Sequence, residues 1–97
     1  MGRTPNVIFR ELYRNAKKKI DKINSLDDNI NKPMIAQISK EDHCYYVYYQ
    51  DVVKAFMMEG YSEEKAVKHI MKWLDNDFLT ARYMDKYKLI GIGDDVA

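Results

Sequence analysis

The sequence predicts an α+β domain, and three observations support that prediction. Two short helical patterns follow one another with Gly60 between them, two strand-like runs come directly afterwards, and an amphipathic helical pattern precedes them all. With 97 residues and 46% hydrophobic content, the chain is long enough for one domain with a modest core. We therefore expect a single domain over residues 1–97, with a helix at 1–24, a core at 33–93 and a tail at 94–97.

The N-terminal helix is expected over about residues 5–23. Apolar side chains recur there with helical spacing, at Ile8, Leu12, Ala16, Ile20 and Ile23. Basic side chains accompany this apolar line, at Arg3, Arg10, Arg14, Lys17, Lys18, Lys19 and Lys22. A charged helix face of this kind is most simply a solvated surface. Its alternative interpretation is an arm that contacts phosphates through Arg10, Arg14, Lys17 and Lys18.

The segment after this helix is expected to be a loop followed by two strands. Residues 25–32 are polar and turn-rich, and Pro33 disfavours helix at the residue before it. Residues 34–39 and 43–49 are interpreted as strands, because the second run crowds tyrosines and a valine together. The alternative is one continuous helix over residues 41–59, capped near its start.

Alternation along the second strand separates its side chains into two sets. Tyr46 and Tyr48 would lie on the face opposite Val47 and Tyr49, because successive strand residues point to opposite faces. One pair is expected in the core and the other on an exposed face. Tyr46 and Tyr48 are therefore candidates for an interface with a partner.

A pair of helices is predicted on either side of Gly60. The first has an apolar stripe of Val52, Val53, Phe56 and Met57. Gly60 would end it, because the residue just past a helix often takes a left-handed conformation that only glycine adopts without penalty. Ser62 is the expected N-cap of the second helix, with Glu63 and Glu64 where the helix dipole favours negative charge.

The second helix is expected to end near Asn76 and to have two distinct faces. Its buried face would hold Ala66, Val67, Ile70, Trp73 and Leu74. The other side would present Lys65, Lys68, His69 and Lys72. Residues 78–83 and 87–92 then form a predicted β-hairpin with a short connection, decorated by Arg82, Lys86 and Lys88. Trp73 and Phe78 are expected in the core.

This order of a helix, a glycine turn, a second helix and a hairpin, over about residues 45–93, resembles a winged helix-turn-helix. The resemblance implies double-stranded DNA as the partner, with the second helix in the major groove and the hairpin, as the wing, near neighbouring phosphates. It also implies a homodimer that places two such helices in successive grooves. The candidate DNA contacts are Lys65, Lys68, His69, Lys72, Arg82, Lys86 and Lys88.

Few residues in the chain are suited to catalysis or metal binding. The adjacent Asp42, His43 and Cys44 would point to alternate faces of a strand, so we expect no metal site. The Gly91 to Gly93 pair lacks the third glycine and the following helix of a phosphate loop. We predict a protein that is not an enzyme and has no cofactor. A single cysteine and the lack of a long apolar run favour a cytoplasmic protein without a membrane span.

Charge is distributed unevenly along the chain. Residues 1–40 carry nine basic against four acidic side chains, and residues 41–97 carry seven against eleven. Two function classes follow. The first is a small dimeric DNA-binding protein, a transcriptional repressor or a replication or partition factor of a mobile element. The second is a protein-binding module, such as a phage-encoded inhibitor of a host or defence protein, for which the fold is only a scaffold.

Overall fold

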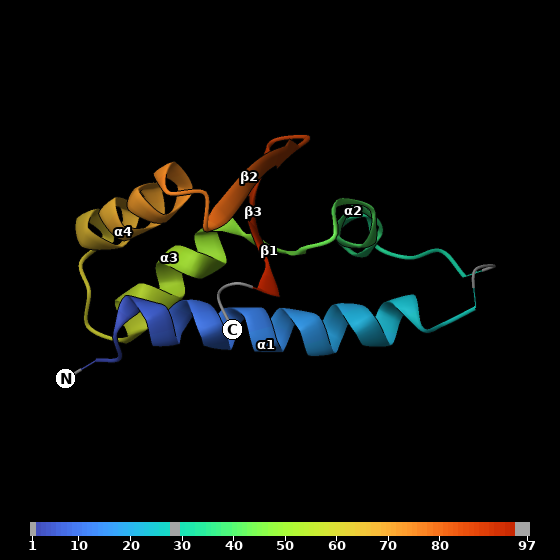
Figure 1. Ribbon diagram of the computed structural model, residues 1–97, viewed down its shortest axis with the longest axis horizontal. Coiled ribbons are helices and arrows are strands. Elements are labelled where there is room, and N and C mark those ends of the chain that lie inside the picture. Colours follow the sequence, from blue (N-terminus) through green and yellow to red (C-terminus); the bar gives the residue numbers. More distant parts are fainter. Residues whose placement is uncertain (1, 28–29, 95–97) are drawn as a thin grey trace.

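A three-stranded antiparallel sheet lies against the middle of the long N-terminal helix (Figure 1). The sheet separates the remaining helices into two groups. The computed structural model describes residues 2–27 and 30–94. Over these residues the elements are, in order, α1 (Pro5–Asn24), α2 (Met34–Asp42), β1 (Tyr45–Tyr48), α3 (Tyr49–Met58), α4 (Glu63–Asp75), β2 (Leu79–Met84) and β3 (Tyr87–Ile92). The result is a compact α+β fold that is compatible with a winged helix.

The central strand of the sheet is β3, which pairs with β1 on one edge and β2 on the other. The register places Gly91 between Tyr46 and Thr80, and Ile92 between Tyr45 and Leu79. Side chains therefore alternate between two faces along each strand. One face meets α1, α3 and α4, and the other meets α2 (Figure 1).

The main core fills the space between α1, α3, α4 and the sheet. Its buried members are Ile8, Phe9, Tyr13, Val52, Val53, Phe56, Ala66, Ile70, Leu79, Ile90 and Ile92. A smaller cluster of Ile38, Tyr46 and Leu89 lies under α2 on the opposite face. Because α1 packs on both α3 and α2, the long helix joins the two sides of the sheet.

The predicted N-terminal helix, the helices on either side of Gly60 and the hairpin after them are confirmed. Local sequence signals explain where the helices begin and end. Helix α1 begins at Pro5, whose fixed φ and missing amide suit a first helical turn. Gly60 has a φ of 95°, the left-handed conformation expected at the end of α3. The Ser62 hydroxyl accepts a hydrogen bond from the amide of Lys65 at 3.2 Å and so caps α4, which ends at Asp75.

Two predictions for the segment before α3 are wrong. Residues 34–39 belong to helix α2, because Ile35, Ala36, Ile38 and Ser39 all lie on one side at helical spacing and pack inward. The alternative of one helix over residues 41–59 is also wrong. His43 takes a left-handed conformation (φ 57°) that ends α2, and β1 then separates it from α3.

The strand predicted at residues 43–49 is shorter than expected. It covers only Tyr45–Tyr48, since Tyr49 already begins α3. Asp42 therefore ends α2, and His43 and Cys44 lie at the turn after it rather than on a strand. Two residues expected in the core are half exposed, namely Met57 on α3 and Phe78 just before β2. Phe78 still packs on Trp73, with ring centroids 5.6 Å apart and the rings tilted by 54°.

Candidate nucleic-acid interface

The outer side of α4 carries three exposed lysines, Lys65, Lys68 and Lys72. They occupy this side because Ala66 and Ile70 turn inward and are fully buried. Lys68 has one acidic neighbour, Glu64, with 3.9 Å between Nζ and Oε1. Both side chains are more than 70% exposed, so this ion pair contributes little and leaves Lys68 able to exchange partners.

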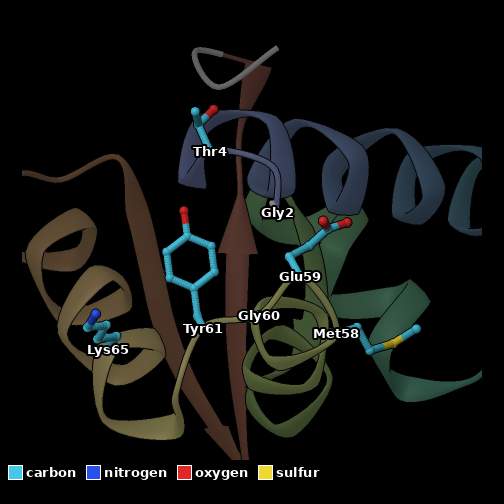
Figure 2. A pocket seen from close by; sticks show the side chains of 7 residues that line it. All are labelled: Gly2, Thr4, Met58, Glu59, Gly60, Tyr61 and Lys65. Carbon is cyan, nitrogen blue, oxygen red and sulfur yellow. The ribbon is translucent and has the colours of Figure 1, made fainter.

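A shallow groove of about 760 Å³ lies at the turn between α3 and α4, beside Lys65 (Figure 2). The N-terminal segment closes one side of it. The Arg3 amide donates to Oε2 of Glu59 at 3.0 Å, and the Tyr61 hydroxyl donates to the Arg3 carbonyl at 3.0 Å. In Figure 2 the Tyr61 ring points toward Thr4, between α4 and the start of α1. These bonds fix the turn that positions α4.

His69 does not lie on the outer side of α4, so that prediction is wrong. Its ring stacks on Phe56 with centroids 5.8 Å apart and an interplanar angle of 22°, and it meets the edge of Tyr61 at 5.6 Å. The side chain is half buried between α3 and α4. It packs there because position 69 borders the buried stripe of Ile70 and Trp73 on the helix. His69 is therefore a packing residue between the two helices.

The hairpin that follows α4 carries lysines over aromatic rings. A two-residue turn at Asp85 and Lys86 joins β2 to β3, with Asp85 in the left-handed conformation at φ 55°. The Lys88 ammonium lies 4.9 Å from the Tyr49 ring centroid and 6.0 Å from that of Tyr83. Tyr83 is 70% exposed, so this cation and ring form an accessible polar and aromatic surface.

Arg82 lies on the other face of the sheet from Lys88. In the register Arg82 pairs with Leu89, and the next pair is Tyr83 with Lys88. Because successive pairs point to opposite faces, Arg82 and Lys88 lie on opposite faces of the sheet. The Arg82 guanidinium donates to Oδ2 of Asp42 at the end of α2, at 2.6 Å. The structure therefore does not bring Arg82 together with the lysines of the hairpin; its charge is engaged by α2.

Tyr46 is buried, so its assignment as an interface residue is wrong. Its ring fills the space between α2 and the sheet, and its hydroxyl donates to Asp42 at 2.6 Å. The Tyr46 hydroxyl, followed by Arg82, lowers the pKa of the Asp42 carboxyl. Burial, followed by the Asp42 hydrogen bond, raises the pKa of Tyr46.

Tyr48 remains exposed, and its ring packs edge to face with the Tyr87 ring, with centroids 5.6 Å apart.

Tyr46→Phe is expected to reduce the free energy of unfolding by about 1 kcal/mol at pH 7, the usual contribution of one hydrogen bond. The folded pKa of Asp42 is lowered, so its contribution is present above the unfolded value of about 4 and is lost as the pH falls through the folded pKa. The deficit of the variant should therefore shrink below about pH 4. Urea denaturation at several pH values measures it.

Tyr48→Phe is the matched control for this prediction, because Tyr48 is exposed and its hydroxyl has no hydrogen-bond partner among the described residues. It should leave stability within about 0.5 kcal/mol, as surface substitutions usually do. An equal loss in both variants, or a Tyr46→Phe deficit that does not vary with pH, would contradict the role of the Asp42 carboxylate.

The basic residues of α1 lie apart from those of α4. Arg10, Arg14 and Lys18 are exposed, while Lys17 pairs with Asp21 at 3.4 Å and lies near the Tyr45 hydroxyl at 3.4 Å. In Figure 1 α1 runs along the side of the molecule away from α4. The structure therefore separates the candidate phosphate contacts into two surfaces rather than one.

Sequence reasoning missed the aromatic surface of the hairpin. The rings of Tyr83 and Tyr87 are exposed on opposite faces of the sheet, and Tyr48 reaches Tyr87 from β1. The signal was the hairpin itself, because a two-residue turn at Asp85 and Lys86 pairs Tyr83 with Lys88 and so places both side chains on one face. Knowing that Tyr48 lies beside Tyr87 required the pairing of β1 with β3.

Neither a metal site nor a membrane segment emerges from the described parts of the chain. No three His, Cys, Asp or Glu side chains among residues 2–27 and 30–94 are grouped so that they could hold a metal ion. In the same residues, no helix combines the length and the apolar character needed to cross a membrane. No family model, no curated protein and no solved structure matches the chain.

Proposed function

We propose that the protein binds double-stranded DNA through α4 and the β2–β3 hairpin, in the manner of a winged helix-turn-helix. The observation that carries the proposal is the arrangement from α2 to β3. A helix, a strand, two helices and a hairpin follow one another, and the strand order is β1-β3-β2. This arrangement leaves the outer side of α4 and the hairpin tip free to meet a partner, as in helix-turn-helix proteins that bind DNA.

Lys65, Lys68 and Lys72 would supply the contacts from α4. Their spacing of three and four residues puts them on one side of the helix, where ammonium groups can reach phosphates or the acceptors of guanine. Glu63 and Glu64 occupy the first turn and would repel phosphates there. We therefore expect the middle and end of α4, rather than its N-terminus, to approach the DNA backbone.

The hairpin would contribute Lys86 at its turn and Lys88 on β3. Lys86 is exposed, with its ammonium 6.0 Å from the Tyr87 ring centroid, so it remains available to a phosphate. A protein of this size that binds duplex DNA as a dimer would act as a transcriptional repressor, or as a replication or partition factor of a mobile element. Both roles need only occupancy of a DNA site.

Fluorescence anisotropy with a labelled random-sequence duplex tests the proposal. Five phosphate contacts, one for each of the five lysines, give a salt slope near 4.5, so affinity should fall about five-hundredfold between about 50 and 200 mM salt. Lys68→Glu with Lys72→Glu should abolish most binding at the lower salt. Lys68→Ala alone should reduce the slope by about 1, since one phosphate contact is removed.

Lys40→Glu is the matched control for a single reversal on α4, Lys68→Glu, because each changes the net charge by the same amount. Lys40 is exposed on α2, across the sheet from α4, so the same reversal of charge there should leave affinity within about twofold. Absence of binding by the unmodified protein at the lower salt would sink the proposal. Equal losses in Lys40→Glu and in the α4 variant would attribute binding to net charge rather than to α4.

A second candidate function is supported by exposed apolar side chains. Tyr48 and Tyr87 form an accessible ring pair, and Met58 on α3 is 87% exposed. Aromatic and methionine side chains are enriched at protein interfaces. A phage-encoded inhibitor of a host or defence protein would use such a surface. Binding of that kind should survive Lys68→Glu and fail in Tyr48→Ser with Tyr87→Ser, the reverse of the pattern expected for DNA.

A further inference from the structure

The solvent side of α1 carries a row of four cations, Arg10, Arg14, Lys18 and Lys22, which we call the basic ridge. They recur at every fourth residue, so each lies one helical turn from the next with a small rotation. All four are exposed. The opposite side of the helix is committed to the core, where Phe9, Tyr13 and Ile20 are buried.

The acidic side chains of α1 do not neutralise the basic ridge. Glu11 pairs with Arg3, which precedes the helix. Asp21 pairs with Lys17 at 3.4 Å and accepts a hydrogen bond from the Tyr45 hydroxyl at 2.6 Å. Across residues 2–27 and 30–94, no ion pair involves any of the four ridge side chains. The two carboxylates are thus occupied by groups outside the ridge, which leaves its positive charge uncompensated.

The ridge is also more strongly charged than α4. Helix α1 contains six basic and two acidic residues, whereas α4 contains three of each. From Arg10 to Lys22 the helix rises about 18 Å, at 1.5 Å per residue. The row winds by about a third of a turn around α1 over that length, because each step of four residues adds about 40°. An extended, winding row of charge matches the repeating phosphates of a duplex, which carries about one charge per 1.7 Å of axis, better than it matches a small anion.

The ridge faces away from the lysines of α4. Both helices turn their apolar sides to the shared core, where Phe9 of α1 meets Trp73 of α4 with ring centroids 4.2 Å apart. Their outer sides therefore point in diverging directions, with α1 and α4 on different sides of the core in Figure 1. A straight duplex that lies against α4 cannot also lie along the ridge.

We propose that the basic ridge of α1 binds a second segment of double-stranded DNA, so that one molecule bridges two duplexes. This inference rests on the proposed function of α4. Backbone phosphates are the ligand that the ridge fits, since it offers charge without a cleft to read bases. An anionic membrane is a poorer fit, because an amphipathic helix binds lipid with its apolar side, and that side of α1 is buried.

A two-duplex capture assay tests the bridge. A biotinylated duplex is held on beads, and recovery of a second, fluorescent duplex is measured with the full chain at about 50 mM salt. Arg14→Glu with Lys18→Glu should reduce recovery of the second duplex at least tenfold while the protein still binds the immobilised one. Lys68→Glu with Lys72→Glu should reduce it as strongly, and Lys40→Glu should not. Circular dichroism and light scattering check that fold and oligomeric state are unchanged.

Other outcomes overturn the inference. If the unmodified protein binds one duplex by anisotropy but never recovers a second, bridging fails while the proposed function stands. If the ridge variant still bridges, the second duplex is held by another surface, such as the α4 of a dimer partner. If only the ridge variant loses binding to the first duplex, the proposed role of α4 falls and the bridge with it. Ridge-dependent sedimentation with phosphatidylserine vesicles, without a second duplex, would assign the ridge to membranes instead.

Discussion

Phe9→Ala is expected to lower the free energy of unfolding by about 3–5 kcal/mol. Phe9 is fully buried, and its ring contacts Phe56 of α3 at 5.3 Å and Trp73 of α4 at 4.2 Å between centroids. Truncation would leave a cavity where three helices meet. Since small domains are stable by only about 5–15 kcal/mol, the variant should be largely unfolded at moderate urea concentrations.

Urea denaturation followed by tryptophan fluorescence measures this effect, and Trp73 is the single tryptophan of the sequence. Phe78→Ala is the matched control. Phe78 also contacts Trp73, at 5.6 Å, but it is 48% exposed, so we expect a loss below about 1 kcal/mol. Similar losses in the two variants would contradict the central position of Phe9 in the core.

Gly91→Ala should cost about 1–3 kcal/mol through overpacking. A Cβ at position 91 would lie 2.8 Å from Sγ of Cys44 and 2.9 Å from Cε1 of Tyr46. The buried Tyr46 ring cannot move aside easily, because its hydroxyl is held by Asp42 under α2. For a domain of this length each kcal/mol corresponds to about 4–8 °C in the melting temperature, which differential scanning calorimetry can resolve.

Cys44→Ala supplies the second arm of a double-mutant cycle for this glycine. Removing Sγ relieves the shorter of the two contacts, so the double variant should be less destabilised than the sum of the single variants. Strict additivity would mean that a Cβ introduced at position 91 does not clash with Sγ of Cys44. A melting temperature unchanged by Gly91→Ala would mean that the sheet accepts a side chain at this position.

Sequence reasoning located the helices that have strong local signals and failed where those signals are short. The amphipathic run of α1, the Gly60 turn and the Ser62 cap depend on neighbouring residues, so they could be predicted. Helix α2 has only nine residues, and its few apolar positions fit a strand as well as a helix. Its packing against Tyr46 and Leu89 decides between them, and that contact is long range.

The sequence could predict which charged residues belong to the candidate interface, but it could not predict the contacts that these residues make within the fold. Exposure of Lys65, Lys68 and Lys72 follows from the periodicity of α4 alone. The pairing of Arg82 with Asp42 joins residues 40 positions apart, and the stacking of His69 on Phe56 depends on how α3 crosses α4. No local sequence pattern predicts either contact. The tertiary structure was therefore needed to show that Arg82 and His69 do not lie with the exposed lysines.

The central place of β3 has a consequence for how the protein folds as it is synthesised. Both β1 and β2 pair only with β3, which is the third strand in chain order, so no part of the sheet can form before β3 leaves the ribosome. Until then both edges of β1, which has three tyrosines among its four residues, are unpaired. The helices can form earlier from local contacts. The nascent chain is therefore expected to be helical first and to acquire its sheet in one late step.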